Sequence, residues 1–165
     1  MSRARLKGRP LKSYKTNQDL IHMSASDWIP DDTYTQIKSL MPIPCVDLLI
    51  LHDNRLLLML RNNEPGKDLW FTPGGRVHLG ETLEEAVQRV LEKETGLKPL
   101  YIEQRGTMSH IWPTAHAITT FYRVEVYDRN IIMNEEHRDY RWFSTLPKEC
   151  HPHLRGMIER AGIFK

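Results

Sequence analysis

The sequence predicts an α/β domain in which a mixed β-sheet is sandwiched between helices, an α/β/α architecture. Apolar segments follow one another in the order β-β-β-α-β-β-β-α, which fits such a sheet with helices on its faces. A length of 165 residues suits one domain with a sizeable core. A glycine-rich turn runs directly into an amphipathic helix near the middle of the chain, which supplies one of the covering helices.

Residues 1–25 form a basic tail that we expect to be disordered or loosely attached, so that the domain spans residues 26–165. Six positive charges and no acidic residue occur in the first fifteen residues: Arg3, Arg5, Lys7, Arg9, Lys12 and Lys15. Without these six charges the net charge changes from +2 to −4. The tail can touch nucleic acid or an anionic surface. A solvated tail, or a true start at Met23, explains it equally well, so nucleic acid is not the expected partner.

The chain has no apolar run long enough for a secretory signal or a membrane span. Cys45 and Cys150 lack the spacing of a metal site. We therefore expect reduced thiols in a cytoplasmic protein without a membrane partner.

The first element is expected to be a short helix at Asp31–Leu40, which Ser26 or Asp27 can cap and which Pro42 follows. Two apolar strands come next, Val46–Leu51 and Leu56–Leu60, joined by a turn at residues 52–55.

A third short strand at Leu69–Thr72 leads into a loop that Pro73, Gly74 and Gly75 open. Glycines there let backbone groups approach a ligand closely. Thr82 and Glu85 form a capping box, so a helix begins at about Thr82.

Apolar residues recur through this helix at helical spacing, and Gly96 is suited to end it in a left-handed conformation. This unit of strand, glycine loop and helix can present backbone groups and carboxylates to a metal-bound phosphate.

The remaining elements are three strands and a helix that Gly162 ends: Leu100–Met108, Ala117–Val126, Tyr140–Phe143 and the helix Leu154–Ala161. Residues 110–116, which include Pro113, are predicted to be a loop. His151 and His153 resemble a metal-binding pair only superficially, because Pro152 separates them and no third ligand follows. We interpret them as part of a surface turn, and Trp28 and Trp112 as core or dimer packing.

Residues 74–97 resemble the Nudix box, G-x5-E-x7-R-E-U-x-E-E-x-G-U, where U is aliphatic. Seven residues fall on this pattern: Gly75, Glu81, Arg89, Leu91, Glu94, Gly96 and Leu97. The resemblance implies the Nudix fold and structural roles for four of them: Gly75, Glu81, Arg89 and Gly96. An ion pair or hydrogen bonds between Glu81 and Arg89 would fix the carbonyl groups of the loop.

Val90 and Lys93 stand where the Nudix family usually has glutamates. Mg²⁺ often takes only one or two protein carboxylates, and phosphate and water complete its shell. We therefore expect a single Mg²⁺, replaceable by Mn²⁺, at Glu94 and the Gly74 carbonyl. Glu136 occupies a position where the family offers a glutamine ligand; it either binds the metal or is a solvated loop acid.

With these two departures from the box, the chain resembles the GDP-mannose mannosyl hydrolase branch of the Nudix superfamily. The resemblance extends over about residues 28–146. Three segments outside the box share the resemblance: residues 42–47, 58–63 and 135–142. It implies Mg²⁺-dependent hydrolysis of a nucleotide sugar, with water attacking the anomeric carbon and with GDP and a free hexose as products. It also implies a homodimer that involves the N-terminal helix.

The same resemblance implies roles for six further residues. The catalytic residues are His137 as general base, with Arg61 and Tyr122 stabilising the leaving diphosphate. The substrate-binding residues, on the sugar or sugar phosphate, are Asp47, Arg76 and His110. Imidazole titrates near neutrality, and the guanidinium fork suits phosphate oxygens. Four of these residues also have a simpler explanation. His137 can be a solvated histidine in a charged loop, and Arg61 an exposed arginine at a strand end. Tyr122 can be a packed aromatic, and Asp47 a structural aspartate.

Two other functions remain open from the sequence. One is a Nudix pyrophosphohydrolase that cleaves the P–O–P bond of a nucleoside diphosphate derivative. The other is a non-catalytic Nudix domain that binds a nucleotide, or nucleic acid through the basic tail. The presence of Glu94, Arg61 and His137 together argues against the non-catalytic function.

Overall fold

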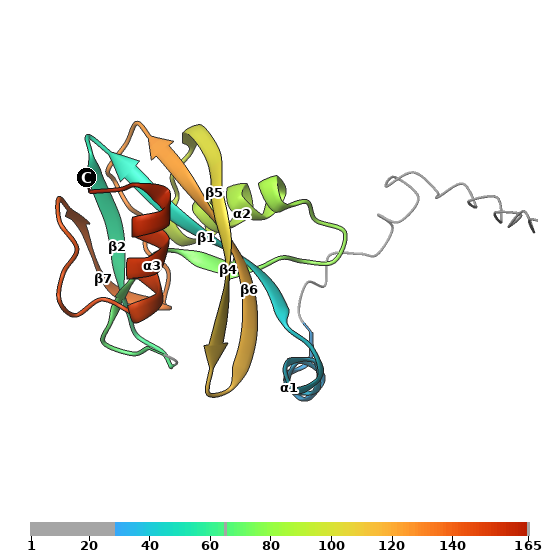
Figure 1. Cartoon of the computed structure of the whole chain (residues 1–165). Helices are drawn as coiled ribbons and strands as arrows, with labels where there is room; N and C mark the ends of the chain where they lie inside the picture. The colour runs from blue at the N-terminus through green and yellow to red at the C-terminus, as the bar shows by residue number, and fades with distance from the viewer. Residues whose placement is uncertain (1–28, 65, 165) are drawn as a thin grey trace, which may run out of the picture.

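A seven-stranded mixed sheet lies between two helices in the computed structural model, which describes residues 29–64 and 66–164 (Figure 1). The elements are α1 (Asp31–Leu40), β1 (Ile43–His52), β2 (Arg55–Arg61), β3 (Trp70–Phe71), β4 (Gly74–Arg76), α2 (Leu83–Thr95), β5 (Pro99–Trp112), β6 (Ala115–Val126), β7 (His137–Phe143) and α3 (Pro152–Ala161). The expected α/β/α architecture is confirmed. The basic tail, the expected helix caps Ser26 and Asp27, and Trp28, which was interpreted as core or dimer packing, lie outside the described residues.

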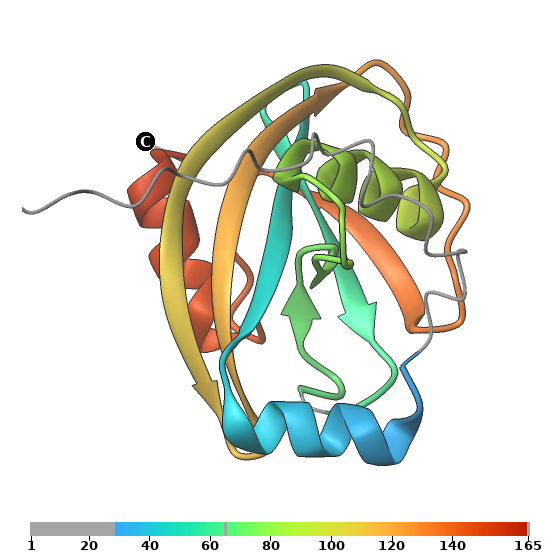
Figure 2. The same ribbon diagram turned by 90° about the vertical axis from the view of Figure 1, so that its right-hand side faces the viewer.

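The two helices cover opposite faces of the sheet because the strands alternate their apolar side chains (Figure 2). In β1, Val46, Leu48 and Ile50 pack in the cluster that contains the apolar side of α2. Leu49 and Leu51 pack in the cluster that contains α3. All five side chains are buried, so β1 is apolar on both faces.

The sheet divides at β1 and β2, and this division makes room for the site. One edge of β1 pairs with β6 in parallel, and its other edge pairs with β2 at Leu51 and with β4 at Cys45–Asp47. Beyond the hairpin, β2 pairs with β3 instead. Residues 70–76 therefore bridge the gap between the diverging strands, and the Leu48 N–H donates to the Pro73 carbonyl at 2.9 Å.

The elements expected around the first hairpin are present with extended bounds. Asp53 and Asn54 both have positive φ, 47° and 58°, as the tight turn of a two-residue hairpin requires. β1 begins earlier than expected, at Ile43, because its pairing with β6 starts at Ala117. The Gly74–Arg76 segment, predicted to be a loop, is a short strand because it pairs with β1.

The helix boundaries follow the signals in the sequence. The capping box of Thr82 and Glu85 is formed, and Gly96 ends α2 with φ 69°. Gly162 ends α3 in the same left-handed conformation. The interpretation of His151 as part of a surface turn is wrong. Its side chain is buried and caps α3 by accepting the His153 N–H.

The prediction of a loop at residues 110–116 is also wrong. β5 and β6 continue pairing up to Trp112 and Ala115, so the turn consists of Pro113 and Thr114 alone. Proline fits there because a turn position needs no ladder N–H. His110 consequently lies within β5, opposite Ala117.

α1 lies at one end of the sheet and contacts β6 (Figure 2). No helix within the described ranges is both long and apolar enough to cross a bilayer. Cys45 and Cys150 are free thiols.

Candidate functional site

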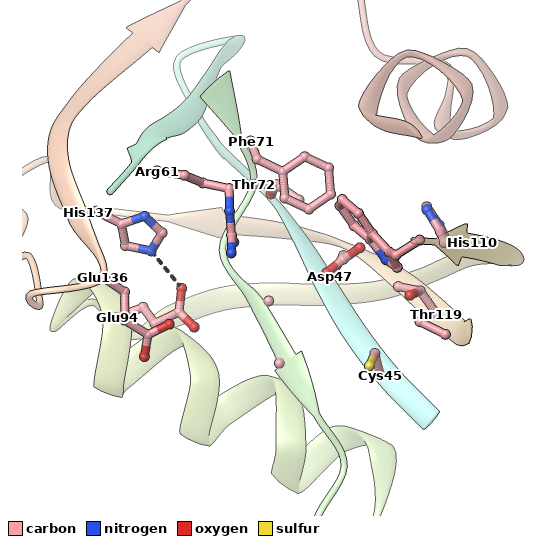
Figure 3. A pocket seen from close by; sticks show the side chains of 14 residues that line it. Cys45, Asp47, Arg61, Phe71, Thr72, Glu94, His110, Thr119, Glu136 and His137 are labelled. Atoms are coloured by element: carbon pink, nitrogen blue, oxygen red, sulfur yellow. Dashed lines mark hydrogen bonds and ion pairs between the residues drawn. The ribbon is translucent and has the colours of Figure 1, made fainter. Parts of the chain in front are cut away.

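A cavity of about 150 Å³ lies where β1 and β2 diverge (Figure 3). Fourteen residues from both faces of the sheet line it: Cys45, Asp47, Arg61, Phe71, Thr72, Gly74, Gly75, Glu94, His110, Trp112, Ala117, Thr119, Glu136 and His137. Seven of the nine residues predicted to be catalytic, substrate-binding or metal-binding meet here: Asp47, Arg61, Gly74, Glu94, His110, Glu136 and His137.

Glu94 and His137 form one end of the cavity. Glu94 stands in the last turn of α2 with 5% of its surface exposed, and its Oε2 lies 3.2 Å from His137 Nε2 (Figure 3). The sequence placed His137 in a charged loop. Instead it begins β7, pairs with Arg61 of β2 and is buried. Its Nδ1 is buried with no hydrogen-bond partner among the described residues, whereas its Nε2 contacts Glu94, which also lines the cavity.

The turn before β7 is held by its own polar groups. The Asn134 side chain accepts the Glu136 N–H at 3.1 Å, and its carbonyl accepts the His137 N–H at 3.3 Å. The Glu136 carbonyl accepts the Asn62 N–H, which ties this turn to the end of β2. The side chain of Glu136 remains half exposed and lies 3.5 Å from Lys93 Nζ.

Asp47 is buried on β1, next to the glycine segment. Burial, and then the charge of Glu94, raises the pKa of Asp47 to about 8, although Arg61 acts in the opposite direction. A Cβ atom at Gly74 would collide with the Asp47 carboxylate and the Val46 carbonyl. Glycine is therefore required for β4 to approach β1 this closely.

Glu81 and Arg89 fix the segment between β4 and α2, as expected. Arg89 Nε donates to Glu81 Oε1 at 2.6 Å, and its Nη2 donates to the Arg76 carbonyl at 2.9 Å. Glu81 also accepts the His78 N–H. Burial favours a higher pKa for Glu81, but the hydrogen bonds from Arg89 and His78 outweigh it, so its pKa lies below the ordinary value.

A second cavity of about 430 Å³ adjoins the first, and the two share Gly74, Gly75, Glu94 and Glu136. Its remaining lining residues are Arg76, His78, Arg89, Val90 and Lys93. Val90 and Lys93, the two departures from the Nudix box, therefore both line this second cavity. Three of its lining side chains are cationic: Arg76, Arg89 and Lys93. Such a lining suits phosphate oxygens.

Two of the residues predicted to be catalytic or substrate-binding do not line the first cavity. Arg76, expected to contact the sugar, lines the second cavity, and its guanidinium lies 5.1 Å from the centre of the Tyr34 ring. Tyr122, expected to stabilise the diphosphate, is buried in the core beneath α2 and lines neither cavity. Burial, and then the charge of Glu84, raises the pKa of Tyr122. Tyr122 is therefore a packed aromatic residue, which was the alternative to a catalytic role.

The other end of the cavity contains residues that the sequence analysis did not assign to the site. Trp112 lines it beside His110, and both lie on the same face of β5. Burial, and then the charges of His153 and His151, lowers the pKa of His110 to about 4. One signal in the sequence could have placed Trp112 in the site together with His110: residues two apart in a strand share a face. The same rule brings Cys45 to the side of Asp47.

The donor set of the cavity fits a single hard cation. Within residues 29–64 and 66–164, no group of three or more His, Cys, Asp or Glu side chains is arranged to hold a metal ion. Glu94, Glu136 and the Gly74 segment line the same cavity and offer two carboxylates and backbone oxygens. Mg²⁺ accepts such an incomplete set because it keeps waters and substrate phosphates as ligands.

Comparisons with known proteins agree with this geometry. The family model described as NUDIX domain matches residues 41–149. The low-salt glycan biosynthesis protein Agl8 of Haloferax volcanii is 32% identical over 139 residues, 79% of this chain and 89% of the relative. The ADP-ribose pyrophosphatase of Methanocaldococcus jannaschii is 35% identical over 118 residues, 69% of this chain and 70% of the relative.

A solved structure supports the fold. The MutT NUDIX hydrolase from Burkholderia pseudomallei aligns with a TM-score of 0.67 at 25% identity, over 73% of this chain and 98% of that chain.

Proposed function

This chain belongs to the Nudix hydrolase family, and from that premise we propose that it is a Mg²⁺-dependent hydrolase of GDP-mannose or a related nucleotide sugar. Water attacks the anomeric carbon, and GDP and a free hexose leave. The observation that carries this proposal is the pairing of Glu94, the one buried carboxylate that α2 contributes to the cavity, with the imidazole of His137 at 3.2 Å.

The small number of metal ligands favours attack at carbon. Glu94, Glu136 and the Gly74 carbonyl would hold one Mg²⁺, which would supply Lewis-acid stabilisation of the departing diphosphate. Val90 and Lys93 offer no carboxylate that could hold further cations. Activation of the water is therefore assigned to a side chain.

His137 takes the proton from the attacking water through Nε2. The new bond forms between the water oxygen and the anomeric carbon, while the bond from that carbon to the diphosphate oxygen breaks. Because Nε2 contacts the Glu94 carboxylate in this structure, Nε2 carries the hydrogen of the neutral imidazole. Before Nε2 can accept a proton, the imidazole has to leave the carboxylate and carry its hydrogen on Nδ1 instead. A positioned general base contributes about 10²–10⁴-fold to the rate.

The two cavities suggest how the substrate lies. The diphosphate occupies the shared border at Gly74, Gly75 and Glu94, where the Arg61 guanidinium can donate to its oxygens. The nucleoside end extends into the cationic second cavity. The sugar occupies the first cavity, near Asp47 and His110. The name of the Haloferax relative, a glycan biosynthesis protein, supports a sugar substrate.

The second candidate is hydrolysis of the P–O–P bond. It is favoured by the 35% identity with an ADP-ribose pyrophosphatase. With GDP-mannose, this reaction gives GMP and mannose 1-phosphate, so the products separate the two candidates.

Hydrolysis of GDP-mannose in ¹⁸O-water tests the proposal, with mass spectrometry of the products. Attack at carbon places the label in mannose and leaves GDP unlabelled. Label in a phosphate group would refute attack at carbon and establish the second candidate. A panel of other nucleotide sugars and ADP-ribose, with EDTA as the metal-free control, shows whether GDP-mannose is the preferred substrate.

Absence of turnover for every member of the panel would favour the non-catalytic alternative. In that event nucleic-acid binding by the full chain, compared with the chain lacking residues 1–25 at several salt concentrations, tests the tail. Binding through the tail weakens steeply with salt and disappears with the truncation.

We also propose that the protein is a homodimer that uses α1 and works in the cytoplasm. α1 has no buried residue, and Leu40 is 83% exposed. A ten-residue helix is marginal by itself in water, and a second copy would cover its apolar side. Free Cys45 and Cys150 suit a reducing compartment. Sedimentation is expected to show a dimer that Leu40→Asp dissociates, and a wild-type monomer at micromolar concentration would refute it.

A further inference from the structure

Four rings from β5 and the start of α3 pack together at the end of the first cavity remote from Glu94. We name them the imidazole wall: His110, Trp112, His151 and His153. Ring centres lie 4.0 Å apart for His110 and His153, 4.5 Å for Trp112 and His151, and 5.1 Å for His151 and His153. His110 and Trp112 line the cavity, whereas His151 and His153 lie behind them.

We propose that the imidazole wall is the specificity determinant of the sugar end of the cavity, where it selects an uncharged sugar over a uronate. In this arrangement His151 and His153 are positioning residues that act through Trp112 and His110. The inference rests on the proposed nucleotide-sugar function, and it adds the class of sugar.

The first support is an unpaired, buried polar atom on a residue that lines the cavity. His110 is 1% exposed, and its Nε2 has no hydrogen-bond partner in the part of the chain that the structure describes. An unsatisfied buried polar group costs about 1–3 kcal/mol, which a ligand hydroxyl would recover. Beside it, the flat indole of Trp112 offers an apolar face to the ring of a sugar. A hydrogen-bonding atom next to an aromatic face suits a neutral, hydroxyl-rich ring.

The second support is the charge of the lining. Burial lowers the pKa of both His110 and His151 to about 4, so both rings are neutral at neutral pH. Among the described residues, Arg61 is the one arginine or lysine that lines this cavity, and the carboxylates of Glu94 and Glu136 line it as well. Asp47 also lines it, but its pKa of about 8 leaves it mostly protonated at neutral pH. A sugar carboxylate would be desolvated there without a cation of its own, which is unfavourable.

The third support is the way α3 fixes the wall. His151 Nδ1 accepts the His153 N–H at 3.3 Å as the cap of α3, so the backbone of the helix sets the orientation of its ring. The ring of Phe71, itself a lining residue, packs edge-to-face with the same ring, and the two ring centres lie 5.1 Å apart. The indole of Trp112 is therefore held against a ring that cannot turn freely.

Two matched pairs of ligands test the proposal: GDP-mannose with GDP-mannuronate, and UDP-glucose with UDP-glucuronate. Within a pair only the C6 group changes, from hydroxymethyl to carboxylate. Calorimetric binding to His137→Ala in Mg²⁺, where turnover is slow, gives the affinities, and GDP and UDP serve as sugar-free references. We expect the neutral member to bind about tenfold more tightly, which corresponds to about 1.4 kcal/mol. Equal or tighter binding of the uronates would overturn the proposal.

His153 offers a matched pair of variants because its ring is less buried than that of His151. His153→Lys places a permanent charge behind His110, and His153→Gln keeps the position neutral. We expect the preference for the neutral sugar to fall several-fold in His153→Lys and to persist in His153→Gln. An equal change in both variants would indicate a merely structural role and would contradict the assignment.

Trp112 separates binding from chemistry. Trp112→Ala is expected to raise KM for nucleotide sugars about tenfold with kcat little changed, whereas Trp112→Phe retains most of the affinity and GDP inhibits all forms equally. A fall in kcat alone would contradict the role of the wall.

The outcomes distinguish this inference from the proposed function. Turnover without discrimination within either pair refutes the wall and leaves the function intact. Binding discrimination without turnover of any nucleotide sugar refutes the function and leaves the wall intact. Failure of both members of both pairs to bind more tightly than GDP or UDP refutes the wall as a sugar site.

Discussion

At the scale of single residues, the chemistry depends on pairs that are distant in the sequence. Glu94 lies in the last turn of α2 and His137 begins β7, and their side chains meet at 3.2 Å in a buried site. Each residue alone has an ordinary explanation, as a helix acid or a loop histidine. Their contact inside a cavity makes the chemical interpretation stronger, because a buried carboxylate and imidazole need a reason to be there.

Removal of the imidazole tests this pair. His137→Ala is expected to lower kcat by about 10²–10⁴-fold, the usual contribution of a general base, while Mg²⁺ binding followed by calorimetry stays nearly unchanged. His116→Ala is the matched control, since His116 contacts Ser109 at the β5–β6 hairpin and lines neither cavity. Full activity of His137→Ala would remove this residue from the mechanism.

At the scale of elements, short interactions at helix ends hold the site in place. The Glu81–Arg89 pair ties the segment before α2 to the carbonyl of Arg76. The His151 cap starts α3 and orients the rings behind Trp112. In both cases a polar side chain does a local structural task and thereby fixes groups that line a cavity.

The Glu81–Arg89 pair can be broken from one side. Glu81→Ala removes the acceptor of Arg89 Nε and of the His78 N–H, so we expect a loss of about 1–3 kcal/mol in the free energy of unfolding and a larger relative loss in kcat/KM. Urea denaturation and steady-state kinetics measure the two effects. Glu92→Ala, on the exposed side of α2, is the control. Unchanged kinetics in Glu81→Ala would show that the loop carbonyls do not need this pair.

The buried cap of α3 makes stability sensitive to acid. Burial, and then the charges of His153 and Arg61, lowers the pKa of His151 from 6.5 to about 4. Because the folded state disfavours the protonated ring, its contribution to stability is complete above pH 6.5 and is lost as the pH falls towards 4. His151→Asn keeps a capping side chain without a titrating group. Thermal midpoints between pH 7 and pH 4 should fall less in this variant than in the wild type; parallel curves would contradict the assignment.

At the scale of the whole molecule, the site is built where the sheet divides. β1 and β2 separate after their hairpin, β3 and β4 fill part of the opening, and α2 borders what remains through Glu94. The cavity is therefore lined from both faces of the sheet, which gives one end the metal and base residues and the other end the imidazole wall. The cationic second cavity lies beside the first.

Ligand binding should consequently stabilise the entire fold. Saturating Mg²⁺ with GDP, at about 100 times the dissociation constant, adds about 2.7 kcal/mol to the free energy of unfolding and raises the thermal midpoint by several degrees. We expect EDTA to abolish most of this shift, because the few protein ligands need the diphosphate and the cation together. Glu94→Gln should behave like EDTA. An undiminished shift in EDTA would show that GDP binds independently of a cation.

The sequence by itself determined the elements whose signals are local. The capping box at Thr82, the left-handed residue Gly96 and the turn at Asp53-Asn54 act within a few residues of themselves, so the ends of α2 and the first hairpin followed from them. The Nudix box likewise indicated the family, because its spacing is set by one helix and the loop before it.

Only the tertiary structure decided which side chains share a cavity. The β5–β6 pairing turned an expected loop into strand and brought His110 and Trp112 to the wall, while Tyr122 went to the core. The packing of α3 buried His151, whose neighbours in sequence suggested an exposed turn. These outcomes depend on pairing and burial between segments far apart in the chain, and periodicity within a segment carries no information about its distant partners.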